Sequence, residues 1–197
     1  AWLGLTWDGP VLRQATRSTA YEAALTALLR RGLIYGCKCS RRDIAQAASA
    51  PQEGAPPNWG PDGLVYPGTC RPQVAGHPLA GPAQRLDMAA ALAGCSEIAF
   101  QELSDDLTTP IVHINNVDHL IDNIGDVVIS RNDGAAAYHL AVVVDDAAQD
   151  ITHVMRGADL LSATPIHAVL QHLLGYAKPI YHHHALIRDT NGKRLAK

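Results

Sequence analysis

The last third of this chain alternates between strand-like and helix-like segments. Three short segments rich in β-branched and aromatic residues predict strands at 126–130, 150–155 and 179–187. Between the last two, TPIHAVLQHLLG has the spacing of a helix that begins with Thr164 as N-cap and ends before Gly175. The apolar segment AAAYHLAVVVDD fits either a strand or a helix. Strands that alternate with helices predict an α/β sheet.

The first half of the chain contains two further segments with helical spacing. TRSTAYEAALTALLRRG places its tyrosine and leucines on one face, and Thr19 with Glu22 has the spacing of a capping box. SRRDIAQAA predicts a short helix that begins at a second capping box, Ser40 with Asp43.

The segment 49–82 has a different character, because its eight prolines exclude regular structure over most of its length. We expect it to be a loop excursion. The segment AQRLDMAAALAG that follows predicts a helix, and the polar stretch from there to Asn123 has the composition of strands. RNDG, directly after DVVIS, predicts a hairpin turn.

Three of the four cysteines lie in two short stretches, CKC and YPGTC. Thiolates are strong zinc ligands, and paired cysteines in a reducing compartment favour a metal site over a disulfide. Cys37, Cys39 and Cys70 therefore predict a zinc site with three thiolates. Cys95, at the end of a predicted helix, is expected to be a buried free cysteine.

The fourth ligand of such a site is open when chemistry alone is considered. Asp62, His77 or water would be ordinary ligands. A phenolate is an uncommon ligand, so Tyr66 by itself is better explained as loop packing.

Composition excludes several classes of protein. Hydrophobic residues make up 47% and charged residues 18% of the 197 residues, as in ordinary globular domains. No apolar run approaches the roughly 18 residues of a membrane span and no leader pattern is visible, so we expect a cytoplasmic protein without a membrane partner. The net charge of −3 gives no overall attraction to nucleic acid. The basic residues around CKC fit a solvated helix face: Arg30, Arg31, Lys38, Arg41 and Arg42.

Polar residues gather near the carboxyl ends of predicted strands, where open α/β sheets bind ligands. Arg156 precedes a glycine at such an end, and its guanidinium could clamp a carboxylate in a bidentate manner. The alternative is a surface ion pair of Arg156 with Asp159 or Asp145. Asp145 and Asp146 could hold magnesium, or they form a solvated turn.

Two other stretches have ordinary explanations when taken singly. Successive residues of a strand face opposite sides, so His182, His183 and His184 cannot share one metal ion. NGKRLAK combines a glycine turn with three cations, the last of them Lys197. Such a loop could stabilise a triphosphate, or it is a basic surface loop.

Taken together and in order, these segments resemble the catalytic domain of the class I glutamyl-tRNA synthetases. The resemblance rests on WDGPVLRQATRSTAYEAALTALLRRGLIYGCKCSRRDI, GDVVISRNDGAAAYHLAVVVDD, ITHVMRGADLLSATPIHAVLQHLLG and GKRLAK. It covers nearly the whole chain, except the proline-rich loop and the stretch from Val74 to about Asn123. It implies an α/β, Rossmann-like catalytic domain without its N-terminal part, carrying an inserted zinc-binding subdomain.

The resemblance also implies a division of the chain into four segments. They are the remainder of the first half of the catalytic domain at 1–35, the zinc-binding insertion at 36–72, a connecting and tRNA-contacting region at 73–124, and the second half of the catalytic domain, ending in a KMSKS-like loop, at 125–197.

Within this family, the pattern C-x-C…Y-x3-C resembles the short paralogues that attach glutamate to queuosine in tRNA(Asp). The resemblance implies Tyr66 as the fourth zinc ligand beside Cys37, Cys39 and Cys70. This replaces Asp62, His77 or water, the fourth ligands that chemistry alone favours. VVVDD, where the full-length enzymes commonly have NVVDD, favours the same paralogues.

Four residues match substrate-binding positions of the family. Tyr138 and Arg156 match its glutamate-binding residues. His183 matches the histidine before the KMSKS loop, on the ATP side. Lys197 matches the catalytic lysine that stabilises the ATP phosphates.

The chain departs from the family pattern in three places. Arg194 stands where the loop's first lysine is usual, and Ala196 replaces its serine. The family's HIGH signature and the acidic strand after it are expected ahead of Ala1. We therefore expect these 197 residues alone to be inactive in glutamate-dependent ATP–pyrophosphate exchange.

The resemblance implies an enzyme that activates L-glutamate with ATP and Mg²⁺ and transfers it to the queuosine base in the anticodon of tRNA(Asp). It implies bound Zn²⁺ and a monomer. One alternative is the catalytic domain of a tRNA-charging glutamyl-tRNA synthetase. A second is a non-catalytic tRNA-binding zinc module.

Overall fold

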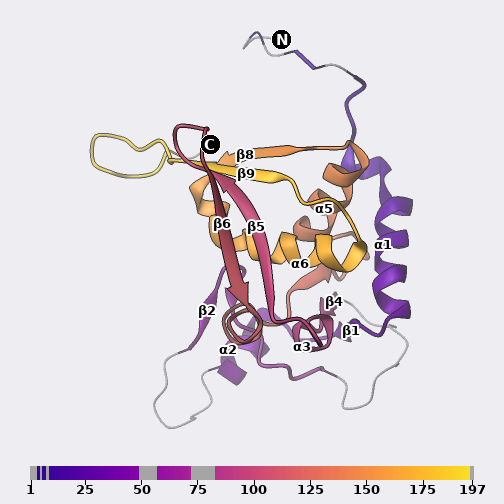
Figure 1. Ribbon diagram of the computed structural model, residues 1–197. Helices are drawn as coiled ribbons and strands as arrows, with labels where there is room; N and C mark the ends of the chain where they lie inside the picture. Colours follow the sequence, from indigo (N-terminus) through magenta and orange to yellow (C-terminus); the bar gives the residue numbers. More distant parts are fainter. Residues whose placement is uncertain (1–3, 5, 8, 49–56, 72–82, 196–197) are drawn as a thin grey trace.

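The computed structural model describes residues 4, 6–7, 9–48, 57–71 and 83–195. Two sheets and a short hairpin are packed around a layer of helices (Figure 1). His77, Ala196 and Lys197 lie outside the described residues, so the predictions made for them concern the sequence alone.

The larger sheet has the strand order β6-β5-β9-β8, in which β9 is parallel to both β5 and β8 and β6 is antiparallel to β5. The smaller sheet, in the order β1-β4-β7, is antiparallel throughout. The strands are β1 Ile34–Cys37, β2 Trp59–Gly60, β3 Gly63–Leu64, β4 Ala83–Leu86, β5 Glu97–Leu103, β6 Pro110–Asn116, β7 Val128–Ser130, β8 His153–Gly157 and β9 Ile180–His184. Because β1, β4 and β7 come from distant parts of the sequence, the smaller sheet joins stretches that are far apart along the chain.

The helices lie between and beside these sheets. α6 packs on β5, α5 packs on α6, and α1 covers both on the side away from the long strand pair β5 and β6 (Figure 1). The helices are α1 Ser18–Arg30, α2 Arg41–Ala48, α3 Met88–Ala91, α4 Val117–His119, α5 Tyr138–Ala148 and α6 Thr164–Leu174. Short 3-10 helices occupy Gln14–Thr16 and Ala158–Ala163, and a π-helical turn occupies Leu120–Ile124.

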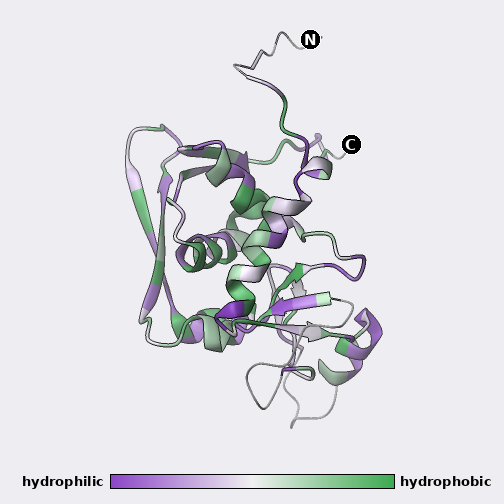
Figure 2. Ribbon diagram, turned by 90° about the vertical axis from the view of Figure 1, so that its right-hand side faces the viewer, coloured by the Kyte–Doolittle hydropathy of each residue, from purple (hydrophilic) through white to green (hydrophobic). Residues whose placement is uncertain are grey.

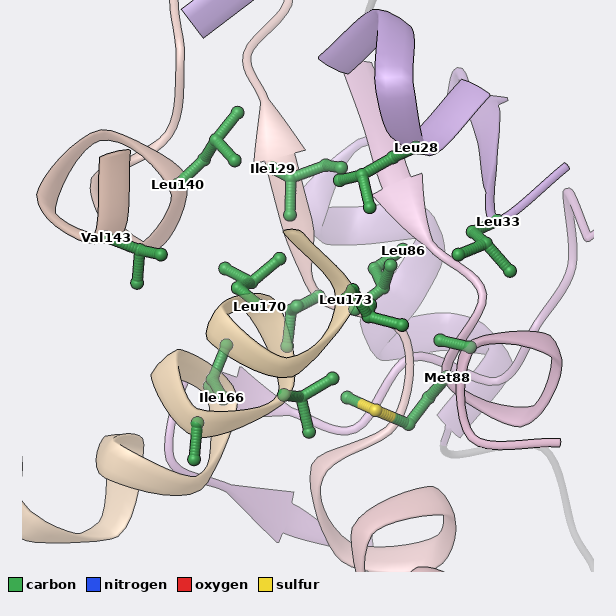
Figure 3. Packing of buried hydrophobic residues seen from close by; sticks show 14 of the residues in the cluster. Leu28, Leu33, Leu86, Met88, Ile129, Leu140, Val143, Ile166, Leu170 and Leu173 are labelled. Atoms are coloured by element: carbon green, nitrogen blue, oxygen red, sulfur yellow. The ribbon is translucent and has the colours of Figure 1, made fainter. Parts of the chain in front are cut away.

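The hydrophobic core is centred on α6, of whose eleven residues nine are buried. The helix contributes Ile166 and Leu170 to a cluster that also contains Leu28 of α1, Leu86 of β4 and Ile129 of β7 (Figure 3). Figure 2 shows hydrophobic residues concentrated in the middle of the molecule, where these helices meet the strands. A helix buried on nearly all sides fixes the position of any polar group that it carries, because its neighbours leave it no room to shift.

The predicted strands at DVVIS, DITHVM and PIYHHHALI are confirmed as β7, β8 and β9. The predicted helices at the start of the chain and at TPIHAVLQHLLG are confirmed as α1 and α6, and the ambiguous AAAYHLAVVVDD forms α5. The capping box of Ser40 with Asp43 is also confirmed, with Asp43 N 3.2 Å from Ser40 Oγ and Ser40 N 2.7 Å from Asp43 Oδ2.

Two predicted caps are wrong for the same physical reason. α1 has Arg17 at its N-cap and no side-chain cap, so Thr19 and Glu22 form no capping box. Thr164 is the first residue of α6 rather than its N-cap. In both places a 3-10 turn leads into the helix: Arg17 N donates to the Gln14 carbonyl before α1, and Thr164 N donates to the Leu161 carbonyl at the start of α6.

Two other predictions need correction. AQRLDMAAALAG is not one helix. Its first four residues form β4, and α3 begins after Asp87, whose Oδ1 accepts from Ala90 N at 3.0 Å. Pairing of β4 with β1 and β7 outweighs the helix propensity of the alanines. Cys95 is half-buried rather than buried, because it lies at the surface with its Sγ 3.7 Å from His172 Nε2.

Candidate functional site

Arg156 lies at the carboxyl end of β8, next to His183 of β9 in the sheet register. Its Nε donates to His183 Nε2 at 3.1 Å, and its Nη1 donates to His167 Nδ1 at 3.0 Å. Its Nη2 donates to Thr164 Oγ1 at 2.7 Å and to the Leu160 carbonyl at 3.3 Å. The edge of the sheet and the start of α6 thus hold the guanidinium in one orientation.

The charge of Arg156 has no carboxylate partner within ion-pair distance among the described residues. Asp159 pairs with Arg194 at 2.9 Å, and Asp145 pairs with Arg17 at 3.1 Å. The alternative of a surface ion pair between Arg156 and either aspartate is therefore wrong. All four acceptors of its hydrogen bonds are neutral groups. The Arg156 charge acts on Asp146, where it opposes the rise in pKa, and its guanidinium lies 5.0 Å from the Tyr181 ring centroid, but no carboxylate of the described residues pairs with it directly.

The hydrogen-bond geometry of Arg156 limits how a carboxylate can bind. A guanidinium has five N–H donors, and four of those in Arg156 are used, so one N–H of Nη1 has no acceptor among the described residues. A carboxylate can take that donor directly. A bidentate contact requires Nη2 to give up its longest bond, the one of 3.3 Å to Leu160.

Tyr138 lies near Arg156, with His167 between them. It is the first residue of α5 and is 49% exposed, so a ligand can reach it. Its ring centroid is 5.9 Å from that of His167, which receives the hydrogen bond from Arg156. The structure therefore brings the two predicted glutamate-binding residues to one face of α6.

His183 belongs to the same network but is buried. Its Nδ1 lies 2.7 Å from Glu102 Oε1, and its side chain is only 1% exposed. Burial, opposed by the hydrogen bond to Glu102, lowers the pKa of His183 below its ordinary value. Burial raises the pKa of Glu102, but its hydrogen bonds and charge interactions with His183 and His113 outweigh this and lower it.

Three residues of this network were missed by sequence reasoning. Glu102 lies in β5, His139 in α5 and His167 in α6, and each looks like an ordinary residue of its own segment. Only the packing of α5 and α6 against the end of β8 and β9 brings them together. A polar residue inside the apolar stripe of a predicted helix, as His167 is, was the one available signal.

The paired aspartates do not form a cation site or a solvated turn. Asp145 is buried in α5 and accepts from Tyr21 Oη at 2.7 Å, Arg17 Nε at 3.1 Å and Gln14 Nε2 at 3.3 Å. Burial raises the pKa of Asp146, as does the neighbouring charge of Asp145. Asp145 thus ties α1 to α5, which corrects both sequence interpretations.

A second cluster of polar groups is formed by the cysteines. The sulfur atoms of Cys37, Cys39 and Cys70 all lie within 4.8 Å of one another. The hydroxyl of Tyr66 lies 3.5 Å from Cys37 Sγ and 3.4 Å from Cys39 Sγ, and it accepts from Cys70 N at 2.8 Å. Asp62 is not in this cluster, because its Oδ1 lies 3.5 Å from His139 Nε2 instead.

The dimensions of the cluster fit a tetrahedral zinc ion. With Zn–S bonds of about 2.3 Å, sulfur ligands of one ion lie roughly 3.8 Å apart, and Cys39 Sγ and Cys70 Sγ are 3.5 Å apart. Burial raises the pKa of Cys70, but hydrogen bonds involving Tyr66 and the Lys38 backbone outweigh it and lower the pKa to about 7. A thiol of this kind is readily available as the thiolate that zinc requires.

Tyr66 is held in place by the smaller sheet. The Arg85 guanidinium stacks 3.9 Å from its ring centroid, and Arg85 Nη1 donates to the Asp126 carbonyl at 2.7 Å. The fully buried carboxylate of Asp126 also accepts from Tyr35 and from Arg71, the residue after Cys70, whose Nη2 lies 2.8 Å away. The cysteine cluster is thereby fixed to β1, β4 and β7.

None of the described helices is long and apolar enough to cross a membrane.

Comparison with known proteins shows what this chain is similar to. Residues 101–197 match the family described as tRNA synthetases class I (E and Q), catalytic domain. The whole chain is 53% identical to a protein of Rhodobacter capsulatus named Glutamyl-Q tRNA(Asp) synthetase, of which it covers 69%. A protein of the same name from Nocardia farcinica is 45% identical over 99% of this chain and 57% of its own length. The chain thus spans between about half and two thirds of the relatives that it matches.

A solved structure has the same fold at lower sequence identity. The glutamate-tRNA synthetase of Elizabethkingia anophelis matches 99% of this chain and 40% of that protein, with a TM-score of 0.67 and 22% identity. This likeness concerns the fold alone, and it confirms the predicted class I synthetase catalytic fold with its mixture of helices and strands.

Proposed function

Because this chain belongs to the family of the glutamyl-Q tRNA(Asp) synthetases, we propose that it activates L-glutamate with ATP and transfers it to the queuosine base of tRNA(Asp). In the first step a carboxylate oxygen of glutamate attacks the α-phosphorus of ATP, giving glutamyl-adenylate and pyrophosphate. In the second step a hydroxyl of the base's cyclopentenediol attacks the glutamyl carbonyl, and AMP leaves. Positioning and charge stabilisation, rather than a covalent enzyme intermediate, would supply the rate enhancement.

The observation that carries this proposal is the unpaired charge of Arg156. A half-buried guanidinium without a carboxylate partner among the described residues, aimed by four hydrogen bonds, is suited to a substrate that brings its own carboxylate. Tyr138, an exposed residue on the same face, can offer its hydroxyl to a second polar group of glutamate. Family membership supplies the amino acid, and the geometry supports where it binds.

The ATP side of the proposal rests on two residues. Lys197 would stabilise the ATP phosphates together with Mg²⁺ as negative charge develops on the leaving pyrophosphate. His183 would serve the ATP site indirectly, because its two ring nitrogens already contact Arg156 and Glu102.

Cys37, Cys39, Tyr66 and Cys70 are proposed to hold a structural zinc ion. Such an ion would tie the end of β1 to the loop after β3, and it would take no part in the chemical steps.

The test is glutamate-dependent ATP–pyrophosphate exchange by the complete gene product, in Arg156→Lys beside Arg131→Lys. Lysine keeps the charge of Arg156 but loses the planar fork of donors, so we expect KM for glutamate to rise roughly 10- to 100-fold. Arg131 is exposed and pairs with Asp133 beside it, so its variant should match the parent. Unchanged exchange in Arg156→Lys would remove Arg156 from the glutamate site.

A further inference from the structure

We propose that the hydrogen-bonded histidines His167 and His139, with the carboxylate of Asp62 at their far end, form a relay that fixes the guanidinium of Arg156, and that all three are positioning residues for the substrate carboxylate. This inference rests on the glutamate-binding role proposed for Arg156. None of the three would touch the substrate, since each acts through the next.

The relay is continuous over three contacts. Arg156 Nη1 lies 3.0 Å from His167 Nδ1. His167 Nε2 lies 3.0 Å from His139 Nδ1, and His139 Nε2 lies 3.5 Å from Asp62 Oδ1. Both histidines are buried, at 2% and 7% exposure, whereas the side chain of Asp62 is 50% exposed.

The directions of the two hydrogen bonds in the relay follow from Arg156. Arginine can only donate, so His167 Nδ1 must carry a lone pair and its proton must lie on Nε2. That proton faces His139 Nδ1, which must therefore accept, and the proton of His139 lies on Nε2 toward Asp62. The carboxylate of Asp62 can only accept, so it ends the relay without conflict.

The same ordering excludes a charged histidine in the relay. A proton added to His167 Nδ1 would face the N–H of Arg156, and one added to His139 Nδ1 would face the N–H of His167. Arg156, His139, His183 and the Tyr138 ring are the polar groups that face His167 from neighbouring elements. Burial, followed by the charge of Arg156, lowers the pKa of His167 to about 2, in agreement with a permanently neutral ring.

His183 constrains Arg156 from the other side by the same logic. Its Nε2 accepts from Arg156 Nε, so its proton lies on Nδ1 and points to Glu102, 2.7 Å away. Two neutral imidazoles of opposite tautomer therefore hold Nε and Nη1 at once. The guanidinium can rotate only if one of these bonds breaks, which leaves the free N–H of Nη1 pointing in one direction.

The relay ends in the segment that carries the proposed zinc ligands. Asp62 lies in the two-residue turn between β2 and β3, and this hairpin packs against the π-helical turn at 120–124. A side chain at Gly60 would place its Cβ 2.5 Å from the Asn123 carbonyl, so the hairpin approaches that turn closely. The position of the hairpin is thus linked to the orientation of Arg156.

The first experiment records ¹⁵N spectra of the histidine rings in this chain, which need no enzymatic activity. We expect neutral Nε2–H tautomers for His139 and His167 and a neutral Nδ1–H tautomer for His183 between pH 6 and 8. A charged ring, or the Nδ1–H tautomer at His167, would overturn the relay. Asp62→Ala should leave the Nε2–H tautomer of His139 in place, because His167 still donates to its Nδ1, and should shift only the His139 Nε2 resonance. Because the side chain of Asp62 is 50% exposed, this variant is expected to fold.

The second experiment measures steady-state exchange with the complete gene product of His167→Leu and His167→Asn. Leucine removes the acceptor for Arg156, so we expect KM for glutamate to rise about 10-fold with KM for ATP unchanged. Asparagine keeps an acceptor near the Nδ1 position and should restore most of this loss. His172→Gln, at an exposed histidine on the same helix, should match the parent.

The outcomes separate this inference from the proposed function. If Arg156→Lys raises KM for glutamate but His167→Leu does not, the relay is wrong and the glutamate site stands. If Arg156→Lys itself has no effect, the glutamate site fails, and the positioning role fails with it even when the ring spectra show the expected tautomers. An equal loss in His167→Leu and His167→Asn would also contradict the relay, since only one of them lacks the acceptor.

Discussion

At the scale of single residues, His167 is a neutral histidine buried against a permanent cation. Its pKa is lowered to about 2 from an ordinary value of 6.5, first by burial and then by the charge of Arg156. Below pH 6.5 the unfolded chain therefore binds a proton that the folded chain excludes. The stability that neutral His167 contributes to the folded chain is present in full above about pH 6.5 and declines as the pH falls toward 2.

Because the pKa of His167 is lowered in the folded chain, the free energy of unfolding should depend on pH in a predictable direction. Between pH 6 and 4.5 the parent should lose stability relative to His167→Asn by up to about 1.4 kcal/mol per pH unit, because the variant lacks that titrating group. Urea unfolding at several pH values measures it, with His172→Gln as the control at an exposed position. Parallel pH dependences of parent and His167→Asn would show that His167 is not buried in neutral form.

Sequence reasoning could find Arg156 and Tyr138 but not the groups that orient them. A strand followed by an arginine and a glycine is a local pattern, and so is a tyrosine before an apolar run. The partners of Arg156 come from β9 and α6, and the contact of His167 with His139 spans 28 positions. Spacing along one segment carries no information about such contacts, because they depend on how the elements pack.

At the scale of elements, Asp145 is the main polar connection between α1 and α5. Asp145→Ala would leave the buried hydroxyl of Tyr21 and the guanidinium of Arg17 without their acceptor. We expect a loss of about 2–4 kcal/mol in the free energy of unfolding. Thermal or urea unfolding measures it, with Asp146→Ala beside it. Equal effects of the two variants would contradict the assignment.

The cysteine cluster gives a second prediction at this scale. Metal analysis of the purified chain should find one zinc per chain, lost in Cys70→Ser and bound more weakly in Tyr66→Phe. Phenylalanine keeps the ring under Arg85 and removes only the hydroxyl that lies beside the sulfurs. Cys95→Ser is the control, since Cys95 lies apart from the cluster. If Tyr66→Phe binds as much zinc as the parent and with the same affinity, the fourth ligand is a residue other than Tyr66 or a water molecule.

The elements themselves were predictable where pattern and tertiary structure agree. α1, α6, β8 and β9 have strong local signals, and the structure confirms them. β4 could not be predicted, because AQRL is strand only through its pairing with β1 and β7, which come from distant positions. The caps of α1 and α6 failed because a 3-10 turn can replace a capping side chain, and no single residue type marks such a turn.

At the scale of the whole molecule, the two clusters lie on one connected framework. The hairpin of β2 and β3 carries Asp62 toward His139, and the same segment continues to Tyr66 and Cys70. Asp126 ties the residue after Cys70 to the smaller sheet, on whose strands part of the hydrophobic core is built. The division of the chain at 1–35, 36–72, 73–124 and 125–197 stays a prediction.

Transfer of labelled glutamate by the complete gene product is the direct test of the proposed transfer of glutamate to queuosine in tRNA(Asp). The substrates are tRNA(Asp) with queuosine, the same tRNA without it, and tRNA(Glu). We expect ATP-dependent label on tRNA(Asp) only when queuosine is present, with the label in the anticodon loop. Label at the 3′ end of tRNA(Glu) would contradict it and identify a tRNA-charging enzyme, whereas binding of tRNA without label on any of them would indicate a non-catalytic module.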